Sequence, residues 1–301
     1  MNTLAFALTV MAFSQVEVPD PADFVAGPVT VVTEGYLFTE GPVWLPDEGR
    51  LLFSDIPANK IFDGDGEVFR DPSGNSNGLV LDNEGRLIAC EHGNRRVSRT
   101  EPDGSITVLA EAYEGKRLNS PNDAVVRSDG AIFFTDPPYG VREEDRELDF
   151  SGVFVILPDG ELVLLADDFD RPNGIALSRD EQTLYVADTR GSHIRAFDLA
   201  EDGTVSNPRL FTELPSPDGM DVDAAGRIWC TSSAGIQVND PDGTTLFVLE
   251  VPIHPANCAF GGEDGKTLFI TARTKVFQVP VHIRGVNFPL PEEDIATDEE
   301  E

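Results

Sequence analysis

The chain has 301 residues, which suits one large all-β domain or two domains of average size. Its 40% hydrophobic content is enough for a core, so wholesale disorder is excluded. Its 54 Asp and Glu against 22 Lys and Arg give a formal net charge of −32, which opposes binding to nucleic acids and anionic membranes. A field of this sign concentrates cations, so we expect a metal ion as a partner, although most of the acids are surface residues.

The two ends of the chain differ from its middle. Residues 1–14 form a short apolar run that ends in an Ala12-x-Ser14 pattern, which a signal peptidase could cut, although no Lys or Arg precedes it. We expect a periplasmic or secreted protein if this segment is a signal peptide, and a cytoplasmic one otherwise. Residues 28–287 are expected to form a single domain, and residues 288–301 an acidic disordered tail.

Two common kinds of functional site have no signature in the sequence. The three cysteines lie in apolar runs, and no CxxC pair or Cys/His cluster indicates a structural zinc site. No GxSxG motif is present either, so a serine hydrolase of the α/β class is not supported.

Six segments of the chain share one pattern: an apolar strand, a polar turn and a second apolar strand. Their first residues are Glu40, Asn77, Asn122, Asn173, Asp218 and Asn257, separated by 37 to 51 positions. Asp-Gly pairs between these segments, as at Asp103-Gly104, indicate further hairpin turns. Four strands in a unit of about 40–45 residues are typical of a β-propeller blade.

The last repeat lacks a fourth strand. It has a hairpin and a third strand but no further Asp-Gly turn, whereas an unpartnered strand, PVTVVT at Pro28–Thr33, stands near the N-terminus. We predict that this strand completes the last blade, because a closed ring leaves no exposed sheet edge. The predicted fold is therefore all-β: a six-bladed β-propeller with four-stranded antiparallel blades, closed by the N-terminal strand.

The first residue of every repeat carries a carboxylate or amide oxygen. Equivalent positions in a radial array converge on the axis, so six oxygen-bearing side chains are predicted at one channel mouth. Such donors suit a hard cation, and Ca²⁺ takes six to eight oxygen ligands. The absence of His from the ring lowers the prospects of zinc and copper. Asn and Asp before Gly are also ordinary turn residues, but six in register favour a site.

A second set of polar residues lies fourteen or fifteen positions further along each repeat. Its members are Asp55, Glu91, Asp136, Asp188 and Ser232, with Ala272 in the last repeat. We expect them to cap strand ends and turns, at the opposite rim from the ring or in the channel wall. His92 is the best-placed histidine for proton transfer, although a packed histidine is the more frequent outcome for such a residue.

Taken together, the repeat motifs resemble the gluconolactonase family, which includes the senescence marker protein (regucalcin) and luciferin-regenerating enzymes. The motifs are EGPVW at 40–44, NSPNDAVV at 119–126, TDPPYG at 135–140, RPNGIALS at 171–178, PDGMDVD at 217–223 and NCAFGG at 257–262. The likeness covers roughly residues 30–285. It implies a six-bladed propeller with one divalent cation, usually Ca²⁺ and in some members Zn²⁺ or Mn²⁺, that hydrolyses sugar lactones to free acids.

The resemblance also implies roles for individual residues. The metal ligands of the family correspond to Glu40, Asn122, Asn173 and Asp218, and Asp218 corresponds also to the general base. We expect the neighbouring polar residues to orient the substrate or the ligands. These are Asn77, His92, Asp123 and Asn257.

Two positions depart from the pattern. Animal sugar lactonases have an Arg two residues before the blade-three Asn, where this chain has Ser120, with Arg117 three residues further back. Both residues are candidates for substrate binding. Related phosphotriester-hydrolysing propellers hold a deeper second calcium with an Asp and a His; Asp221 matches the Asp, but Ala259 stands where the His would be. The resemblance therefore leaves a second structural Ca²⁺ open.

The sequence thus predicts metal-dependent hydrolysis of sugar lactones to aldonic acids, with Asp218 accepting the proton of the attacking water. One alternative is an arylesterase or organophosphate hydrolase at the same site, and another is a calcium-binding propeller without turnover. The expected partner is a small lactone, with neither nucleic acid nor membrane. We expect a monomer or a weak homodimer.

Overall fold

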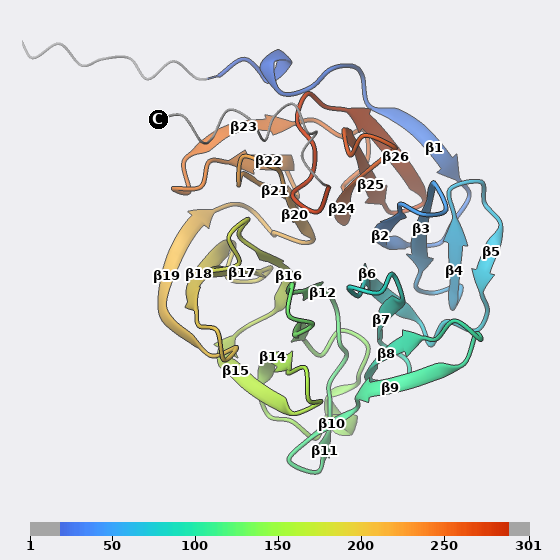
Figure 1. The fold of residues 1–301 in the computed structure, drawn as a ribbon, viewed down its shortest axis with the longest axis vertical. Coiled ribbons are helices and arrows are strands. Elements are labelled where there is room, and N and C mark those ends of the chain that lie inside the picture. The colour runs from blue at the N-terminus through green and yellow to red at the C-terminus, as the bar shows by residue number, and fades with distance from the viewer. Residues whose placement is uncertain (1–18, 289–301) are drawn as a thin grey trace, which may run out of the picture.

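A computed structural model describes residues 19–288, which form six antiparallel four-stranded sheets arranged radially around one axis (Figure 1). The predicted six-bladed β-propeller is therefore confirmed. The possible signal peptide at 1–14 and all but the first residue of the acidic tail lie outside the described residues. Between residues 19 and 288 the helices are two single turns, η1 (Pro21–Asp23) and η2 (Glu143–Asp145), and neither could cross a membrane.

Each blade runs from an innermost to an outermost strand (Figure 1). Blade 1 contains β2 (Thr39–Leu45), β3 (Arg50–Asp55), β4 (Lys60–Asp63) and β5 (Val68–Arg70), and blade 2 contains β6 (Ser76–Leu81), β7 (Leu87–Glu91), β8 (Arg96–Thr100) and β9 (Ile106–Ala110). Blade 3 contains β12 (Ala124–Val126), β13 (Ile132–Asp136), β14 (Ser151–Ile156) and β15 (Leu162–Phe169), and blade 4 contains β16 (Pro172–Leu177), β17 (Thr183–Asp188), β18 (His193–Leu199) and β19 (Val205–Glu213). Blade 5 contains β20 (Met220–Val222), β21 (Ile228–Ser232), β22 (Gly235–Asn239) and β23 (Thr245–Leu249), and blade 6 contains β24 (Asn257–Gly261), β25 (Thr267–Ala272), β26 (Lys275–Pro280) and β1 (Thr30–Glu34).

The core lies between neighbouring blades. The second strands are buried on both faces, which is why three apolar residues follow one another in β3 (LLF) and in β13 (IFF) instead of alternating with polar ones. Phe133 of β13, for example, packs in one cluster with Ile175 and Val186 of blade 4. Burial of large side chains such as this contributes about 1.5–3 kcal/mol each.

The N-terminal strand closes the ring as predicted. β1 pairs antiparallel with β26, with Thr30 opposite Gln278 and Glu34 opposite Lys275, so the edge of blade 6 is covered. The chain before β1 adds a further attachment, because the buried ring of Phe24 lies 4.9 Å from that of Phe247 in blade 5.

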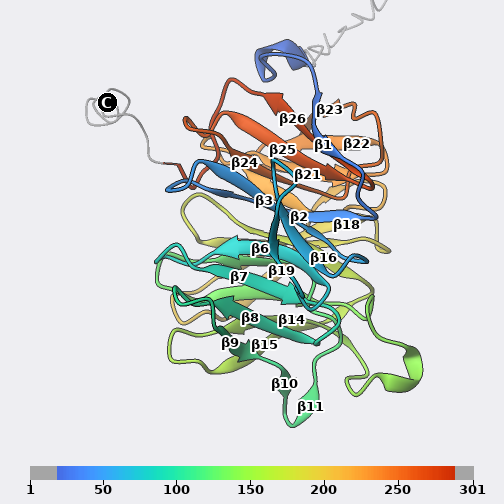
Figure 2. The same ribbon diagram turned by 90° about the vertical axis from the view of Figure 1, so that its right-hand side faces the viewer.

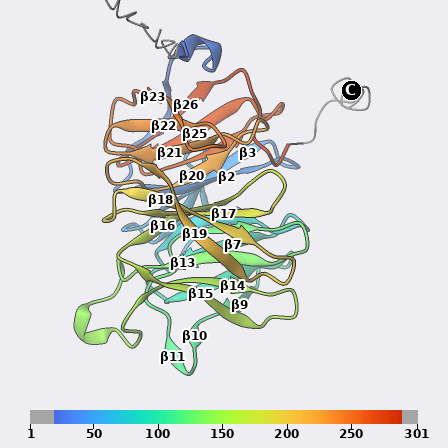
Figure 3. The ribbon, with the colours of Figure 1, turned by 90° about the vertical axis from the view of Figure 1, so that its left-hand side faces the viewer.

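A small hairpin leaves the outer edge of the disc between blades 2 and 3. It consists of β10 (Ala112–Tyr113) and β11 (Lys116–Arg117). Figures 2 and 3, which view the disc edge-on, show this hairpin projecting beyond the blades.

The polar residues that end the second strands lie at the same rim as the ring, so our expectation of the opposite rim was wrong. An antiparallel hairpin returns its second strand to the starting edge; thus Thr39 pairs with Asp55, and Pro172 with Asp188. The expected capping role does hold in blades 1, 3 and 4, where the Asp accepts two consecutive backbone N–H groups from the segment that enters the first strand. These bonds join Asp55 to Leu37 and Phe38, Asp136 to Asn119 and Ser120, and Asp188 to Asp170 and Arg171, at 2.7–3.0 Å.

Candidate functional site

The first residues of the six innermost strands gather around the axis. Gly41, which follows Glu40, has φ 49°, and a Cβ added there would overlap the backbone of Asn77 in the next blade. A Cβ on Gly219, which follows Asp218, would likewise overlap the side chain of Asn257. Glycine is therefore needed at both positions for adjacent blades to approach this closely.

Hydroxyl groups hold neighbouring blades together just below this ring. In four blades a Ser or Thr at or just beyond the end of the second strand donates a hydrogen bond to a backbone carbonyl of the next blade. The pairs are Ser54 with Asn77, Thr135 with Asn173, Thr189 with Pro217 and Thr231 with Ala256, all at 2.7–2.8 Å. The ring residues are thus fixed by bonds across each blade boundary.

Two carboxylates of the ring, Glu40 and Asp218, lie close to a third, Asp123, and the pKa values of all three are raised. Burial raises the pKa of Glu40 well above its usual range, and the charges of Asp218 and Asp123 raise it further. Burial, followed by the charge of Asp123, raises the pKa of the half-buried Asp218 to about 8, and burial raises that of Asp123 to about 7. The charge of Arg273 acts in the opposite direction on Asp218. A cation among these groups would relieve their repulsion.

The amide side chains of the ring are oriented by specific partners. The Nδ2 of Asn173 donates to the Thr189 hydroxyl at 3.0 Å, which fixes the amide beside Asp218. Asn257 donates from Nδ2 to Asp123 at 3.3 Å, while its Oδ1 accepts the Cys258 N–H at 2.8 Å. Asn257 therefore orients the acids of the site, since its side chain bonds to both Asp123 and Glu40.

The remaining members of the predicted ligand set are buried at the same rim. Asn122 is 4% exposed, and its backbone carbonyl accepts the N–H of Gly78 at 2.8 Å, which joins blades 2 and 3. Between residues 19 and 288, no three His, Cys, Asp or Glu side chains cluster as a metal site. The oxygen donors at this rim are instead carboxylates together with asparagine amides.

His92 is a buried, neutral histidine beside the ring. Burial lowers its pKa from the usual 6.5 to about 4. Its Nε2 lies 3.3 Å from Nδ2 of Asn77, which can only donate, so Nε2 is the acceptor and the ring proton is on Nδ1. At neutral pH His92 therefore orients Asn77 and carries no charge.

The two candidates for substrate binding that precede blade 3, Arg117 and Ser120, lie in different parts of the structure. Arg117 lies in the outer hairpin with an exposed side chain that donates to the Asn94 carbonyl at 3.0 Å, so the structure does not bring its guanidinium into the ring contacts. A residue in a projecting hairpin cannot be placed from spacing alone. Ser120 is fully buried, and its hydroxyl accepts the N–H of Gly140 at 2.9 Å.

Tyr139 is a site residue that our sequence reasoning did not single out. It follows β13 in the TDPPYG motif, and its hydroxyl interacts with Thr189 and Asn173 close to Asp218. Burial raises its pKa, and the Asp218 charge raises it further, so the phenol remains a hydrogen-bond donor at neutral pH. Because antiparallel pairing returns β13 to the ring rim, the position of the motif after this strand was the signal that could have found it.

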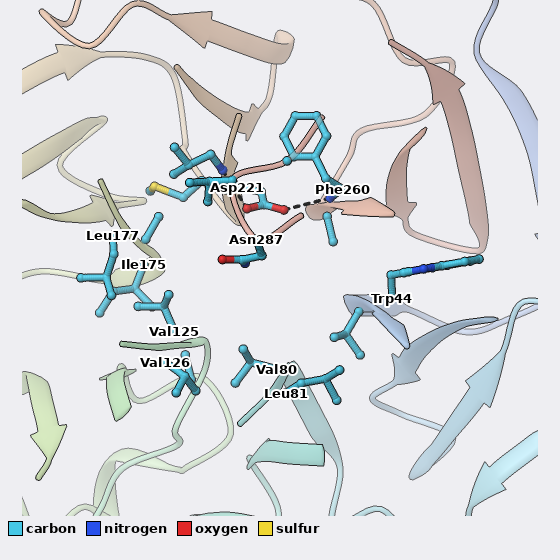
Figure 4. Close-up of a pocket in the computed structure, with 18 of the residues that line it drawn as sticks. Trp44, Val80, Leu81, Val125, Val126, Ile175, Leu177, Asp221, Phe260 and Asn287 are labelled. Atoms are coloured by element: carbon cyan, nitrogen blue, oxygen red, sulfur yellow. Dashed lines mark hydrogen bonds between the residues drawn. The ribbon is translucent and has the colours of Figure 1, made fainter. Parts of the chain in front are cut away.

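The far half of the channel is a cavity of about 530 Å³ whose lining is polar and apolar in similar measure (Figure 4). Val80, Val125 and Ile175 line it from three of the innermost strands, and Asp123 connects it to the underside of the ring. The carboxylate of Asp221 accepts the backbone N–H groups of Val222 and Phe260 at 2.7 and 2.8 Å. Ala259 contributes no side-chain donor beside it, so the His of the phosphotriester-hydrolysing propellers has no counterpart at this position.

The protein is thus a six-bladed β-propeller in which carboxylate and amide oxygens converge at one end of the central channel. The family model of the SMP-30/gluconolactonase/LRE-like region matches residues 38–274, and the chain belongs to this family.

Individual relatives agree with this assignment. A gluconolactonase of Zymomonas mobilis is 35% identical over 291 residues, with 85% of this chain and 82% of the relative covered. A pentonolactonase of Haloferax volcanii is 31% identical over 251 residues, covering 77% and 80% of the two chains. The solved structure of a gluconolactonase of Xanthomonas campestris superposes with a TM-score of 0.79 at 38% identity, covering 84% of this chain and 89% of that one.

Proposed function

We propose that this protein hydrolyses sugar lactones to aldonic acids with the help of one divalent cation, for which Ca²⁺ is the best match. Relatives named as a gluconolactonase and a pentonolactonase support the substrate class. The observation that carries the proposal is the pair of carboxylates Glu40 and Asp218, which lie close enough for the charge of Asp218 to raise the pKa of Glu40, with the Asn173 amide bonded to Asp218. Two carboxylates that oppose each other's ionisation, with asparagine oxygens beside them, are suited to holding a positive charge.

The donors at the ring fit a hard cation. Glu40, Asn122, Asn173 and Asp218 would hold it, since carboxylate and amide oxygens are the ligands that Ca²⁺ prefers. When bound, such a cation polarises the lactone carbonyl and stabilises the negative charge that develops on its oxygen.

The protein's own groups would then move the proton. Beside a bound cation, the Asp218 carboxylate would stay ionised despite the burial that raises its pKa, so that it could accept a proton from a water molecule. It takes a proton from the water as the water oxygen bonds to the carbonyl carbon. The bond between that carbon and the ring oxygen then breaks, and Asp218 returns the proton to the departing ring oxygen. The product is the open-chain hydroxy acid.

The surrounding side chains keep these groups in place. Asn257 holds Asp123 beside Glu40, and Thr189 holds Asn173 beside Asp218. Neutral His92 fixes the amide of Asn77 at the same rim. Such partners maintain the ligand orientation on which both affinity and rate depend.

Acid release in a pH-stat tests the proposal. D-Glucono-, D-galactono- and D-xylonolactone would be supplied to the purified protein with EDTA and after calcium is added back. We expect turnover that EDTA abolishes and calcium restores, and a loss of about 10²–10⁴-fold in kcat for Asp218→Asn. Asp221→Asn, which changes an acid three residues away in the same blade, is the matched control. Undiminished lactonase activity in Asp218→Asn would refute the assigned role.

The two alternatives predict different results in the same assay. An arylesterase or organophosphate hydrolase would turn over phenyl acetate or a phosphotriester faster than any sugar lactone. A non-catalytic calcium-binding propeller would release no acid from any lactone, while calcium would still raise its melting temperature.

A further inference from the structure

A short loop at the ring rim links two predicted substrate residues. The loop, Pro137–Gly140, follows β13, and the N–H of Gly140 donates to the Ser120 hydroxyl at 2.9 Å. A Cβ added to Gly140 would lie 2.5 Å from Ser120 Oγ and 2.8 Å from Cβ of His92. The loop is therefore seated directly on both residues, with no room for a larger side chain at its end.

The side chain of Tyr139 extends from this loop to blade 4. Its hydroxyl interacts with Thr189 and with Asn173, which is one of the proposed cation ligands. The guanidinium carbon of Arg171, from the segment that enters blade 4, lies 5.7 Å from the centre of the Tyr139 ring. Polar contacts thus hold the phenol at the mouth of the channel.

Tyr139 is nevertheless open to solvent. It is 45% exposed, and between residues 19 and 288 no other Phe, Tyr or Trp is exposed. The other tyrosines of the chain, for comparison, pack into blades or between them, as Tyr36 does against Phe53 and Phe62. Its position beside Asn173 and Asp218, at the proposed site, makes this exposed aromatic ring a candidate contact for a ligand.

We propose that Tyr139 binds the sugar ring of the lactone, with its aromatic face against the C–H face of the sugar and its hydroxyl bonded to a sugar hydroxyl. Ser120 acts as a positioning residue, because its hydroxyl anchors the loop that carries Tyr139. In this chain, Tyr139 thereby supplies a recognition group at the rim where Ser120 itself is buried and cannot reach the substrate. The inference rests on the proposed lactonase function and concerns its substrate contact.

Steady-state kinetics on the calcium-loaded full-length protein separate these roles. For Tyr139→Phe we expect KM to rise by about 3–10-fold, because one hydrogen bond to the sugar is lost. For Tyr139→Ala we expect a larger rise in KM, because the aromatic face is lost as well. In each case kcat should change less than KM. Tyr113→Phe, at a half-buried tyrosine in the outer hairpin region, is the matched control and should behave as the wild type.

The positioning role of Ser120 has its own readout. Ser120→Ala should raise KM, whereas Ser120→Thr should leave KM near the wild-type value because it retains the anchoring hydroxyl. In a protein that already carries Tyr139→Ala, the further change Ser120→Ala should raise KM only a little. Calcium is kept saturating for every variant, as judged by isothermal titration, because Tyr139 also contacts the proposed ligand Asn173.

The result that overturns the proposal is an unaltered KM in both Tyr139→Phe and Tyr139→Ala while the wild type turns over lactones. If the wild type has no lactonase activity, the proposed function fails on its own, and binding of D-gluconate and D-xylonate decides about Tyr139. Weaker aldonate binding by Tyr139→Ala would then support the sugar contact, and equal binding by both proteins would overturn it.

Discussion

The pKa of His92 makes a quantitative prediction about stability. The folded protein holds this imidazole neutral down to about pH 4, because the side chain is buried and 7% exposed. The unfolded chain protonates it near pH 6.5. Since the unfolded state binds the proton first, the free energy of unfolding falls as the pH drops from about 6.5 to about 4. His92 is therefore a source of acid sensitivity.

The size of this effect follows from the two pKa values. At pH 5 the unfolded imidazole is about 97% protonated and the folded one about 10%, a difference worth about 2 kcal/mol. At pH 7 the same linkage contributes only about 0.2 kcal/mol. His92→Gln keeps an acceptor for Asn77 but has no titratable group. Between pH 7 and pH 5 the wild type should therefore lose about 2 kcal/mol more stability than the variant does.

Urea unfolding at the two pH values measures this difference. The unfolding free energies of wild type and His92→Gln are compared at each pH, so that the titration of all other acids cancels. An NMR titration of the four histidines should also contain one imidazole with a pKa near 4 that is missing from the variant. Equal losses of stability in the two proteins would show that His92 is not held neutral.

Two further predictions concern the blades and the charge. Gly219→Ala should lower the free energy of unfolding by about 1–3 kcal/mol and weaken calcium binding, because the new methyl group displaces Asn257. Gly64→Ala is the control: a Cβ there lies 3.5 Å from its nearest neighbour, so its free energy of unfolding in urea should stay close to that of the wild type. Molar NaCl should raise the melting temperature, because salt screens the self-repulsion of a chain with a net charge of −32; a melting temperature that does not rise with salt would contradict this interpretation.

The repeating pattern of the sequence was sufficient to predict the blades. Strand alternation, Asp-Gly turns and a period near 40–45 residues are local properties, and each blade is a meander of neighbouring strands. The missing fourth strand of the last repeat was also visible, because a strand without a partner at Pro28–Thr33 had one remaining place to pair. The structure confirmed that pairing between β1 and β26.

Individual side chains at the rim were predicted less well. We predicted the wrong rim for Asp55 and Asp188, although the antiparallel hairpin alone determines at which rim they lie. Arg117 was selected because it lies three residues before Ser120, where the resemblance places a substrate-binding Arg, but the structure places it in a small hairpin at the outer edge. Tyr139 was overlooked because its partners, Thr189 and Asn173, belong to the next blade and are far away in the chain.

The sequence by itself determined the number of blades, the closing strand and the oxygen-bearing residues that begin each repeat. Only the tertiary structure decided that Glu40, Asp123 and Asp218 oppose one another's ionisation, that His92 is neutral, and that Tyr139 faces the channel mouth. Strand period and turn chemistry are set by neighbours along the chain. Electrostatic coupling depends instead on separation and burial in space, and these arise only when Glu40, Asp123 and Asp218, which are 83 to 178 positions apart in the chain, meet on one axis.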